Sequence, residues 1–270
     1  MIQLRKDGYS LCDNNPEGGT MYPIRCRKFH MALISLILVS IFITFELCAG
    51  ADYKVVTTET LKEMIDSKKE FVLIDARTKE EYDDAHIVDA VNIPENKFEN
   101  ASSKLPTDKN ALLVIYCNGV KCGKSKKLAQ KVEVAGYRNI MIYSEGFPVW
   151  EEKDLCFVAG PNYSKKIETT MLSPAQVESL LKEDKGDYVL VDVREPVEFN
   201  EGHIPSAINI PVDIFASKSD VLPKEKKIIV YCNTGSRSYI AYRKLMKLAY
   251  PNIFQTLYAP WKEAGMQISK

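Results

Sequence analysis

Two cysteines, Cys117 and Cys232, each follow a short apolar run and precede a loop that leads into a helical pattern. In Cys232-Asn-Thr-Gly-Ser-Arg-Ser238 the glycine permits a tight loop whose backbone N–H groups can turn inward, and the following helix presents its positive end. Such a nest favours an anion, here the thiolate of Cys232. At an ordinary pKa near 8.5 only about 3% of a thiol is ionised at pH 7, and lowering the pKa by about two units would ionise most of it. The pattern therefore predicts a nucleophilic thiolate.

The loop after Cys117 differs from the loop after Cys232. It reads Cys-Asn-Gly-Val-Lys-Cys-Gly-Lys-Ser, is two residues longer before the shared serine, and carries Lys124 where the other has Arg237. A longer loop makes a wider nest, and a lysine supplies a point charge in place of a planar guanidinium. We therefore expect the Cys232 loop to carry most of the turnover. The added thiol, Cys122, has two possible roles. It either reacts with Cys117, resolving a sulfur adduct on it or locking it in a disulfide, or it simply occupies a loop position.

The two cysteine loops belong to an internal repeat. Residues 71–94 and 188–211 are identical at eleven of 24 positions with an offset of 117, and the segments around the two cysteines match as well. A period of more than a hundred residues has the size of a domain, well beyond that of a solenoid repeat. The sequence therefore predicts one domain duplicated in tandem.

Each copy alternates short apolar runs with helical signals. The runs at 72–74, 112–115 and 140–143, and at 189–191 and 228–231, suit strands buried on both faces of a parallel sheet. Ser173-Pro-Ala-Gln176 is a capping box, and apolar residues at helical spacing follow each cysteine. We predict an α/β fold of two tandem domains, each an open, mostly parallel sheet flanked by helices. The expected boundaries are 52–160 and 168–270, with a linker at 161–167.

Residues 1–51 have the layout of a secretory leader. The basic residues Arg25, Arg27 and Lys28 precede fifteen uncharged residues, Met31 to Phe45, and small residues follow up to Ala51. The alternative is an uncleaved anchor, but a spanning helix needs about 20 apolar residues. We expect cleavage and export to the periplasm or outside the cell, with no stable membrane span afterwards.

Charge and cysteine content narrow the function. Lys plus Arg equals Asp plus Glu at 36 each, so no basic field exists to hold a nucleic acid. Four cysteines remain after the expected leader, too few for a disulfide scaffold. Ligands of open α/β sheets bind at the carboxyl ends of the strands, where Cys117 and Cys232 stand. We therefore interpret these cysteines as reactive residues and not as structural ones.

The motifs around Cys232 resemble those of tandem-domain rhodaneses, which are thiosulfate sulfurtransferase-like proteins. The matching segments of the second copy are Val191-Asp-Val-Arg194, Glu198-Phe199, Gly202-His-Ile-Pro205, Ala207-Ile-Asn-Ile-Pro211 and the cysteine loop. The resemblance implies rhodanese-like domains and a ping-pong transfer in which cysteine takes a sulfane sulfur as a persulfide. It implies a small-molecule donor such as thiosulfate, a thiol or cyanide acceptor or a protein acceptor, and no metal or organic cofactor. The implied nucleophiles are Cys232 and Cys117, and the implied binding residues are Asn233, Thr234, Gly235, Ser236, Arg237 and Lys124.

Two other functional classes compete with this interpretation. Phosphatases and arsenate reductases of this fold place an arginine after five intervening residues, whereas four residues separate Cys232 from Arg237 and six separate Cys117 from Lys124. That class is disfavoured. A noncatalytic sulfur carrier or partner-binding module would look identical in sequence, so it stays open.

The remaining chemical side chains are expected to be structural. The repeated Asp, Arg and Glu residues should tie a strand end to its helix, and the repeated histidines should lie in turns of the fold. The tryptophans are expected in the core or at a pocket wall, and Cys156 as a buried small hydrophobe. These residues are Asp75, Arg77, Glu81, His86, Trp150, Cys156, Asp192, Arg194, Glu198, His203 and Trp261.

Overall fold

The computed structural model describes residues 52–183 and 185–270. The expected leader at 1–51 lies outside these residues. Within the described part, residues 52–270 form a compact unit that carries both copies of the repeat. No helix in that part is long and apolar enough to cross a membrane.

The first copy is built on a five-stranded sheet in which every neighbouring pair is parallel. The strand order is β1-β6-β5-β2-β4. A separate antiparallel pair joins β3 to β7. The strands are β1 (Lys54–Val56), β2 (Val72–Asp75), β3 (Ala85–Ile87), β4 (Val91–Asn92), β5 (Leu113–Tyr116), β6 (Ile140–Tyr143) and β7 (Phe157–Ala159).

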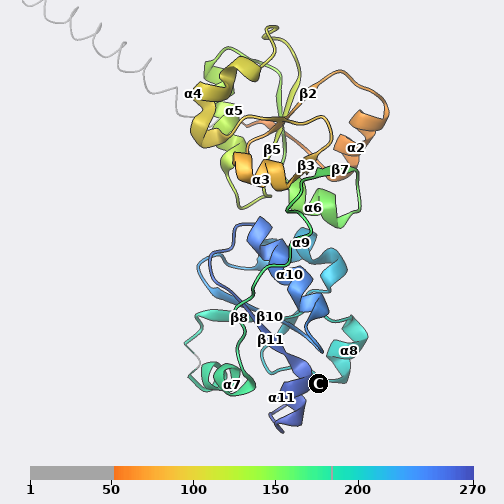
Figure 1. Ribbon diagram of the computed structural model, residues 1–270, viewed down its shortest axis with the longest axis vertical. Coiled ribbons are helices and arrows are strands. Elements are labelled where there is room, and N and C mark those ends of the chain that lie inside the picture. The colour runs from red at the N-terminus through yellow and green to blue at the C-terminus, as the bar shows by residue number, and fades with distance from the viewer. Residues whose placement is uncertain (1–51, 184) are drawn as a thin grey trace, which may run out of the picture. The chain divides into compact units, whose positions relative to one another are not determined.

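Helices cover both faces of this sheet because its central strands are apolar on both sides. Leu113 and Ile115 of β5 face a core that includes Leu128 and Val132. Val114 and Tyr116 face the opposite core. Figure 1 accordingly has α4 and α5 on one side of β2 and β5, and α2 on the other. The helices are α2 (Thr58–Asp66), α3 (Lys79–Asp84), α4 (Phe98–Ala101), α5 (Lys124–Val134) and α6 (Gly146–Glu152).

The second copy repeats this plan on a four-stranded parallel sheet of order β11-β10-β8-β9. Its β11 also bridges Met171, in the place where β1 pairs with β6 in the first copy. Strands β8 and β10 again alternate between two cores. The elements are α7 (Pro174–Glu183), β8 (Tyr188–Asp192), α8 (Pro196–Glu201), β9 (Ile208–Asn209), α9 (Phe215–Lys218), β10 (Lys227–Cys232), α10 (Ser236–Lys247), β11 (Ile253–Leu257) and α11 (Tyr258–Glu263).

The predicted fold class is confirmed. Each predicted strand appears within one or two residues of its apolar run. The capping box before α7 also forms, because the Ser173 N–H donates to Gln176 Oε1 and the Gln176 N–H donates to Ser173 Oγ.

Candidate functional site

Cys117 and Cys232 lie at the carboxyl ends of the central strands β5 and β10. Each of these strands has a parallel neighbour on both sides, so the loops that leave the sheet on that edge surround the sulfur. Both cysteine residues are only 1% exposed. A thiol so placed depends on the few polar groups that reach it.

In the second copy those groups donate hydrogen bonds to the sulfur. The backbone N–H of Gly235 lies 3.2 Å from Cys232 Sγ, and that of Ser238 lies 3.4 Å from it. The Ser238 hydroxyl is 3.5 Å away. Gly235 precedes α10 with φ of +108°, a left-handed conformation that turns its N–H inward at the start of the helix. The predicted nest around Cys232 is therefore present.

The nest lowers the pKa of Cys232. Burial opposes ionisation of this thiol, but the Ser238 hydroxyl and the N–H groups of Ser238, Gly235 and Thr234 stabilise the thiolate more strongly. The pKa of Cys232 therefore lies below that of an ordinary thiol, as a nucleophilic thiolate requires. Hydrogen bonds to the charged form cause this shift.

Gln255 on β11 supports the nest, and the sequence interpretation missed it. Its Nε2 donates to the Gly235 carbonyl at 3.0 Å and to Ser238 Oγ at 2.7 Å. Gln255 thus joins the Gly235 carbonyl and the Ser238 hydroxyl, which itself donates to that carbonyl at 3.2 Å, in one network beside Cys232 Sγ. Two adjacent polar residues, Gln255 and Thr256, between apolar residues of β11 were the available signal. In the first copy Ile142 holds the same register position, opposite the residue two places before the cysteine.

The cation of each loop is paired with a carboxylate. Both terminal guanidinium nitrogens of Arg237 donate to Glu198, and Lys124 Nζ lies 2.8 Å from Glu81 Oε2. The hydrogen bonds from Arg237 lower the pKa of Glu198 to about 2, despite some opposition from burial. Each loop therefore presents an ion pair in place of a bare charge. Each glutamate also caps its own helix, so it links that helix to the cysteine loop.

The first loop gives its two thiols different surroundings. Cys117 Sγ donates to the Gly119 carbonyl at 3.8 Å and to Ser125 Oγ at 3.4 Å. Cys122 is partly buried and packs on the same core. Both cysteines are free.

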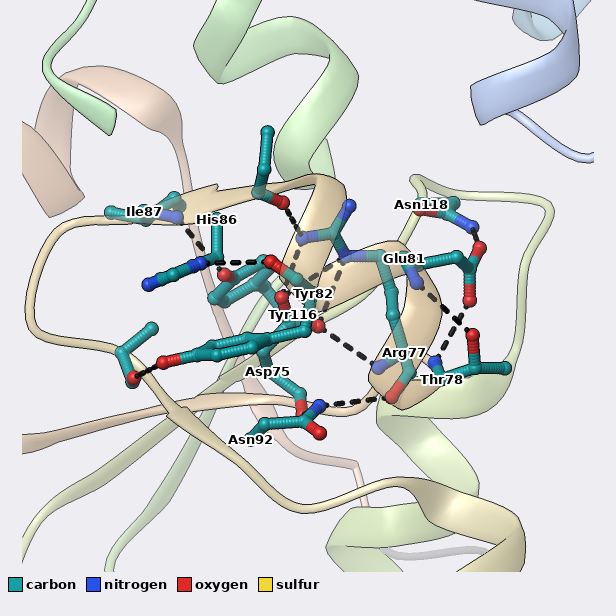
Figure 2. A network of polar contacts seen from close by, with 12 residues as sticks. Asp75, Arg77, Thr78, Glu81, Tyr82, His86, Ile87, Asn92, Tyr116 and Asn118 are labelled. Atoms are coloured by element: carbon teal, nitrogen blue, oxygen red, sulfur yellow. Dashed lines mark hydrogen bonds and ion pairs between the residues drawn. The ribbon is translucent and has the colours of Figure 1, made fainter. Parts of the chain in front are cut away.

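A buried network fixes the ends of β2 and α3 beside the first loop (Figure 2). Arg77 Nη2 lies 2.6 Å from Asp75 Oδ2 and 2.7 Å from the Ala85 carbonyl, which follows α3. Arg194 makes the same bonds to Asp192 and to the Gly202 carbonyl. The predicted role of these pairs, tying strand end to helix, is confirmed.

The histidines and tryptophans are parts of the fold, as predicted. His86 stacks on Tyr82 and His203 on Phe199, and each donates from Nδ1 to the carbonyl of the same aromatic residue. Trp150 and Trp261 are buried, and each indole N–H donates to a backbone carbonyl.

The prediction that Cys156 is buried is wrong. Cys156 is exposed, because it lies in the turn between α6 and β7. Its carbonyl accepts the Trp150 indole bond at 2.9 Å, so the backbone of this residue, and not its side chain, serves the core.

The other predicted binding residues line the outside of the second nest. Asn233, Thr234 and Ser236 are exposed, while Gly235 and Arg237 are half-buried. In the described part of the chain, no group of three or more His, Cys, Asp or Glu side chains is arranged to hold a metal ion.

Comparison with known proteins finds the rhodanese-like domain twice, at residues 57–153 and 173–262. A sulfurtransferase from Allochromatium vinosum is 36% identical over 70 residues, which are 26% of this chain and 65% of that protein. A putative mitochondrial thiosulfate sulfurtransferase from Schizosaccharomyces pombe is 40% identical over 93 residues, covering 29% of this chain and 66% of that protein. The chain thus spans slightly less than two thirds of each relative. A solved thiosulfate sulfurtransferase from Pseudomonas aeruginosa is 21% identical, with 80% of this chain and 43% of that chain covered and a TM-score of 0.36.

Proposed function

Because this chain belongs to the rhodanese-like domain family and carries two such domains in tandem, we propose that it is a sulfurtransferase that works through a persulfide on Cys232. The donor is a sulfane-sulfur compound such as thiosulfate, and the acceptor is a thiol or cyanide. One observation carries the proposal: Cys232 Sγ accepts hydrogen bonds from the N–H groups of Gly235 and Ser238. This is the environment that a nucleophilic thiolate needs.

The reaction has two half-steps. The Cys232 thiolate attacks the outer sulfur of thiosulfate, the S–S bond of the donor breaks, and sulfite leaves with the electron pair. The acceptor then attacks the terminal sulfur of the Cys232 persulfide, and the thiolate returns to its nest. With cyanide as acceptor the product is thiocyanate.

The Arg237–Glu198 pair supports a role in orienting an anionic donor at the rim of the nest. Glu198 fixes the position of the Arg237 guanidinium next to the exposed loop residues. The N–H groups of the guanidinium that Glu198 does not occupy are the ones that would bind the anionic donor. Four residues between Cys232 and Arg237 are too few for the phosphatase pattern described above. Sulfur transfer is therefore preferred over phosphate chemistry.

The test follows thiocyanate formation from thiosulfate and cyanide with the purified full chain, and repeats it with 3-mercaptopyruvate as donor. We expect turnover with at least one donor and a Cys232 persulfide, visible by mass spectrometry, before cyanide is added. Cys156→Ser is the matched control, because it removes an exposed thiol away from both loops. A persulfide that forms but never turns over would assign the carrier function. If neither donor loads Cys232, the proposal is wrong.

A further inference from the structure

A cavity of about 510 Å³ opens on the first domain, apart from its cysteine loop. Its walls come from the end of α2, the start of β2, the turn after β3 and the turn after α6. Phe71 precedes β2 at the amino edge of the parallel sheet, whereas Cys117 follows β5 at the carboxyl edge. The cavity therefore lies away from the site of the proposed sulfur chemistry.

The inside of this cavity is apolar. Its floor is made by Leu73, Ile87 and Trp150, which are buried in the core of the domain. Ile65 and Val88 line its opening, where they are 38% and 39% exposed. Small-molecule sites in proteins are hollows of this size with a mostly apolar lining. The cavity therefore has the dimensions and the surface of a ligand site.

The polar groups around the cavity do not favour an ionic ligand. Three lysines and three aspartates line it, so their charges cancel, and Lys62 forms an ion pair with Asp66. The Trp150 indole N–H already donates to the Cys156 carbonyl at 2.9 Å. An uncharged ligand with an aromatic or branched aliphatic body therefore matches this lining best.

The second domain has a smaller cavity at the same place, with a volume of about 340 Å³. Each of its eight lining residues takes the position of a residue that lines the first cavity. Tyr188 stands where the first domain has Phe71, and Trp261 stands where it has Trp150. The hollow is therefore a feature of the duplicated domain, and the two copies can be compared.

The first cavity reaches deeper than the second. Leu73 and Ile87 line the first cavity, whereas their counterparts Leu190 and Ile204 lie outside the lining of the second. All four side chains belong to the cores of their domains. The first domain has thus extended a shallow hollow of the fold down to its core.

Strained turns frame the opening of the first cavity. Lys68, Asp89 and Asp154 line it with φ of +52°, +63° and +51°, a left-handed conformation that disfavours residues with a Cβ. The counterpart of Asp154 in the second domain is Gly265, which adopts its φ of +69° without that strain. Strained backbone of this kind concentrates at ligand sites, and here it surrounds the deeper cavity.

We propose that the first cavity binds an uncharged apolar small molecule, with Phe71 and Trp150 against its body and the exposed Cys156 at its rim. This site is separate from the sulfur-transfer site, so it does not depend on turnover at Cys232. The second cavity, whose lining does not include the core residues, should bind the same molecule more weakly.

The first experiment uses N-phenyl-1-naphthylamine, an uncharged aromatic fluorophore, as the probe. Titrated into the reduced full chain, it should gain fluorescence with saturation at about one equivalent per chain, because only the first cavity reaches the core. At about four times its Kd the probe should slow alkylation of Cys156 by iodoacetamide about fivefold. Peptide mass spectrometry measures this rate, with Cys122 as the thiol outside the cavity. Fluorescence without protection of Cys156 would overturn the inference.

The second experiment places a charge at the opening. Val88→Glu should weaken probe binding by about tenfold or more, because the ligand would bury the new carboxylate. Pro205→Glu is the matched control, since it makes the same change at the equivalent position of the second cavity, and the Kd should not change. Thermal unfolding checks that both variants are folded. An unchanged Kd in Val88→Glu, or a loss of binding in Pro205→Glu alone, would overturn the assignment to the first domain, and the alkylation of Cys156 in the unaltered chain tests it independently of either variant.

Discussion

At the scale of single residues, the partners of a sulfur decide what a cysteine can do. Cys117 and Cys232 end equivalent strands and are equally buried. One donates to a carbonyl and the other accepts two N–H groups. Because hydrogen bonds donated to the sulfur favour the thiolate, Cys232 is the better nucleophile of these two cysteines.

Gln255→Leu tests how the Cys232 nest is maintained. The substitution removes two donors, from the Gly235 carbonyl and from Ser238 Oγ, and leaves both acceptors buried. We expect the free energy of unfolding to fall by about 1–3 kcal/mol. Without Gln255, the Ser238 hydroxyl and the Gly235 turn are held less firmly beside the sulfur, so the pKa of Cys232 should rise and the activity profile should move to higher pH.

The pH profile of thiocyanate formation and urea unfolding together check this prediction. Gln176→Leu is the matched control, because it makes the same change in the capping box of α7. The control should lose stability with an unchanged pH profile. An unshifted profile in Gln255→Leu would limit Gln255 to a structural role.

Glu198→Gln tests the ion pair with Arg237. The folded pKa of Glu198 is about 2, below its ordinary value of 4.5, so the pair stabilises the fold above pH 4.5 and this contribution is lost as pH falls toward 2. We expect the variant to be less stable at pH 7 by about 0.2–1 kcal/mol, the usual range for partly exposed pairs. The difference from the unaltered chain should shrink as the pH falls below 4.5.

Urea unfolding at pH 7, 5 and 3 measures this difference. Glu201→Gln, an exposed change on the same helix α8, is the control and should have little effect at any of these pH values. A stability loss in Glu198→Gln that stays constant from pH 7 to pH 3 would contradict the assignment to the ion pair.

At the scale of elements, the strand-loop-helix unit aims the N–H groups at the sulfur. Strand β10 delivers Cys232, Gly235 reverses the chain, and α10 begins at the next residue. The site therefore depends on one left-handed residue between two regular elements. In the first domain the equivalent loop is two residues longer, and Gly123 takes the left-handed conformation before α5.

Gly235→Ala tests that reversal. An alanine at φ of +108° is strained, and its Cβ would meet Leu257 Cδ2 at 3.4 Å and Gln255 Nε2 at 3.6 Å. We expect a stability loss of about 1–2 kcal/mol and, because the N–H groups turn away from the sulfur, a larger loss of activity. Gly265→Ala, at φ of +69° with open space around it, should lose stability alone.

Thermal unfolding and thiocyanate formation, measured on both variants, separate the two effects. Retention of full activity in Gly235→Ala, after correction for the folded fraction, would mean that the loop tolerates a different reversal.

At the scale of the whole molecule, duplication has produced two domains with the same framework and different sites. Both keep the Asp-Arg network, the tyrosine that holds the turn after the histidine, and the glutamate that pairs with the loop cation. They differ in loop length, in thiol number, and at Ile142 against Gln255. The shared framework therefore leaves room for different reactions in the two domains.

The comparison of Cys232→Ser with Cys117→Ser tests this division of labour. Serine hardly accepts sulfane sulfur at neutral pH, and the volume changes little. We expect Cys232→Ser to remove most of the thiocyanate formation and Cys117→Ser to leave a substantial part. The reason is that the N–H groups that stabilise a thiolate surround Cys232. Steady-state assays with thiosulfate and cyanide measure both. The reverse result would move the turnover to the first domain, and equal partial losses would mean two independent sites.

The sequence by itself determined the duplication, the α/β class and the position of the two strand-end cysteines. These features depend on apolar periodicity, on capping residues and on glycine, all of which act locally. The role of Asp75 and Arg77 in tying a strand end to its helix also followed from the repeated motifs. Cys156 was misjudged because its residue type suggests burial, whereas its backbone, and not its side chain, is used by the core.

Only the tertiary structure decided which groups surround each strand-end sulfur. The direction of a hydrogen bond at Cys117, the approach of Gln255 from β11 and the pairing of Arg237 with Glu198 all join segments at least 20 residues apart or depend on loop geometry. Thiol ionisation depends on the distance and orientation of these groups, because electrostatic stabilisation in a buried site acts over a few ångströms. Residue order along the chain does not specify those distances.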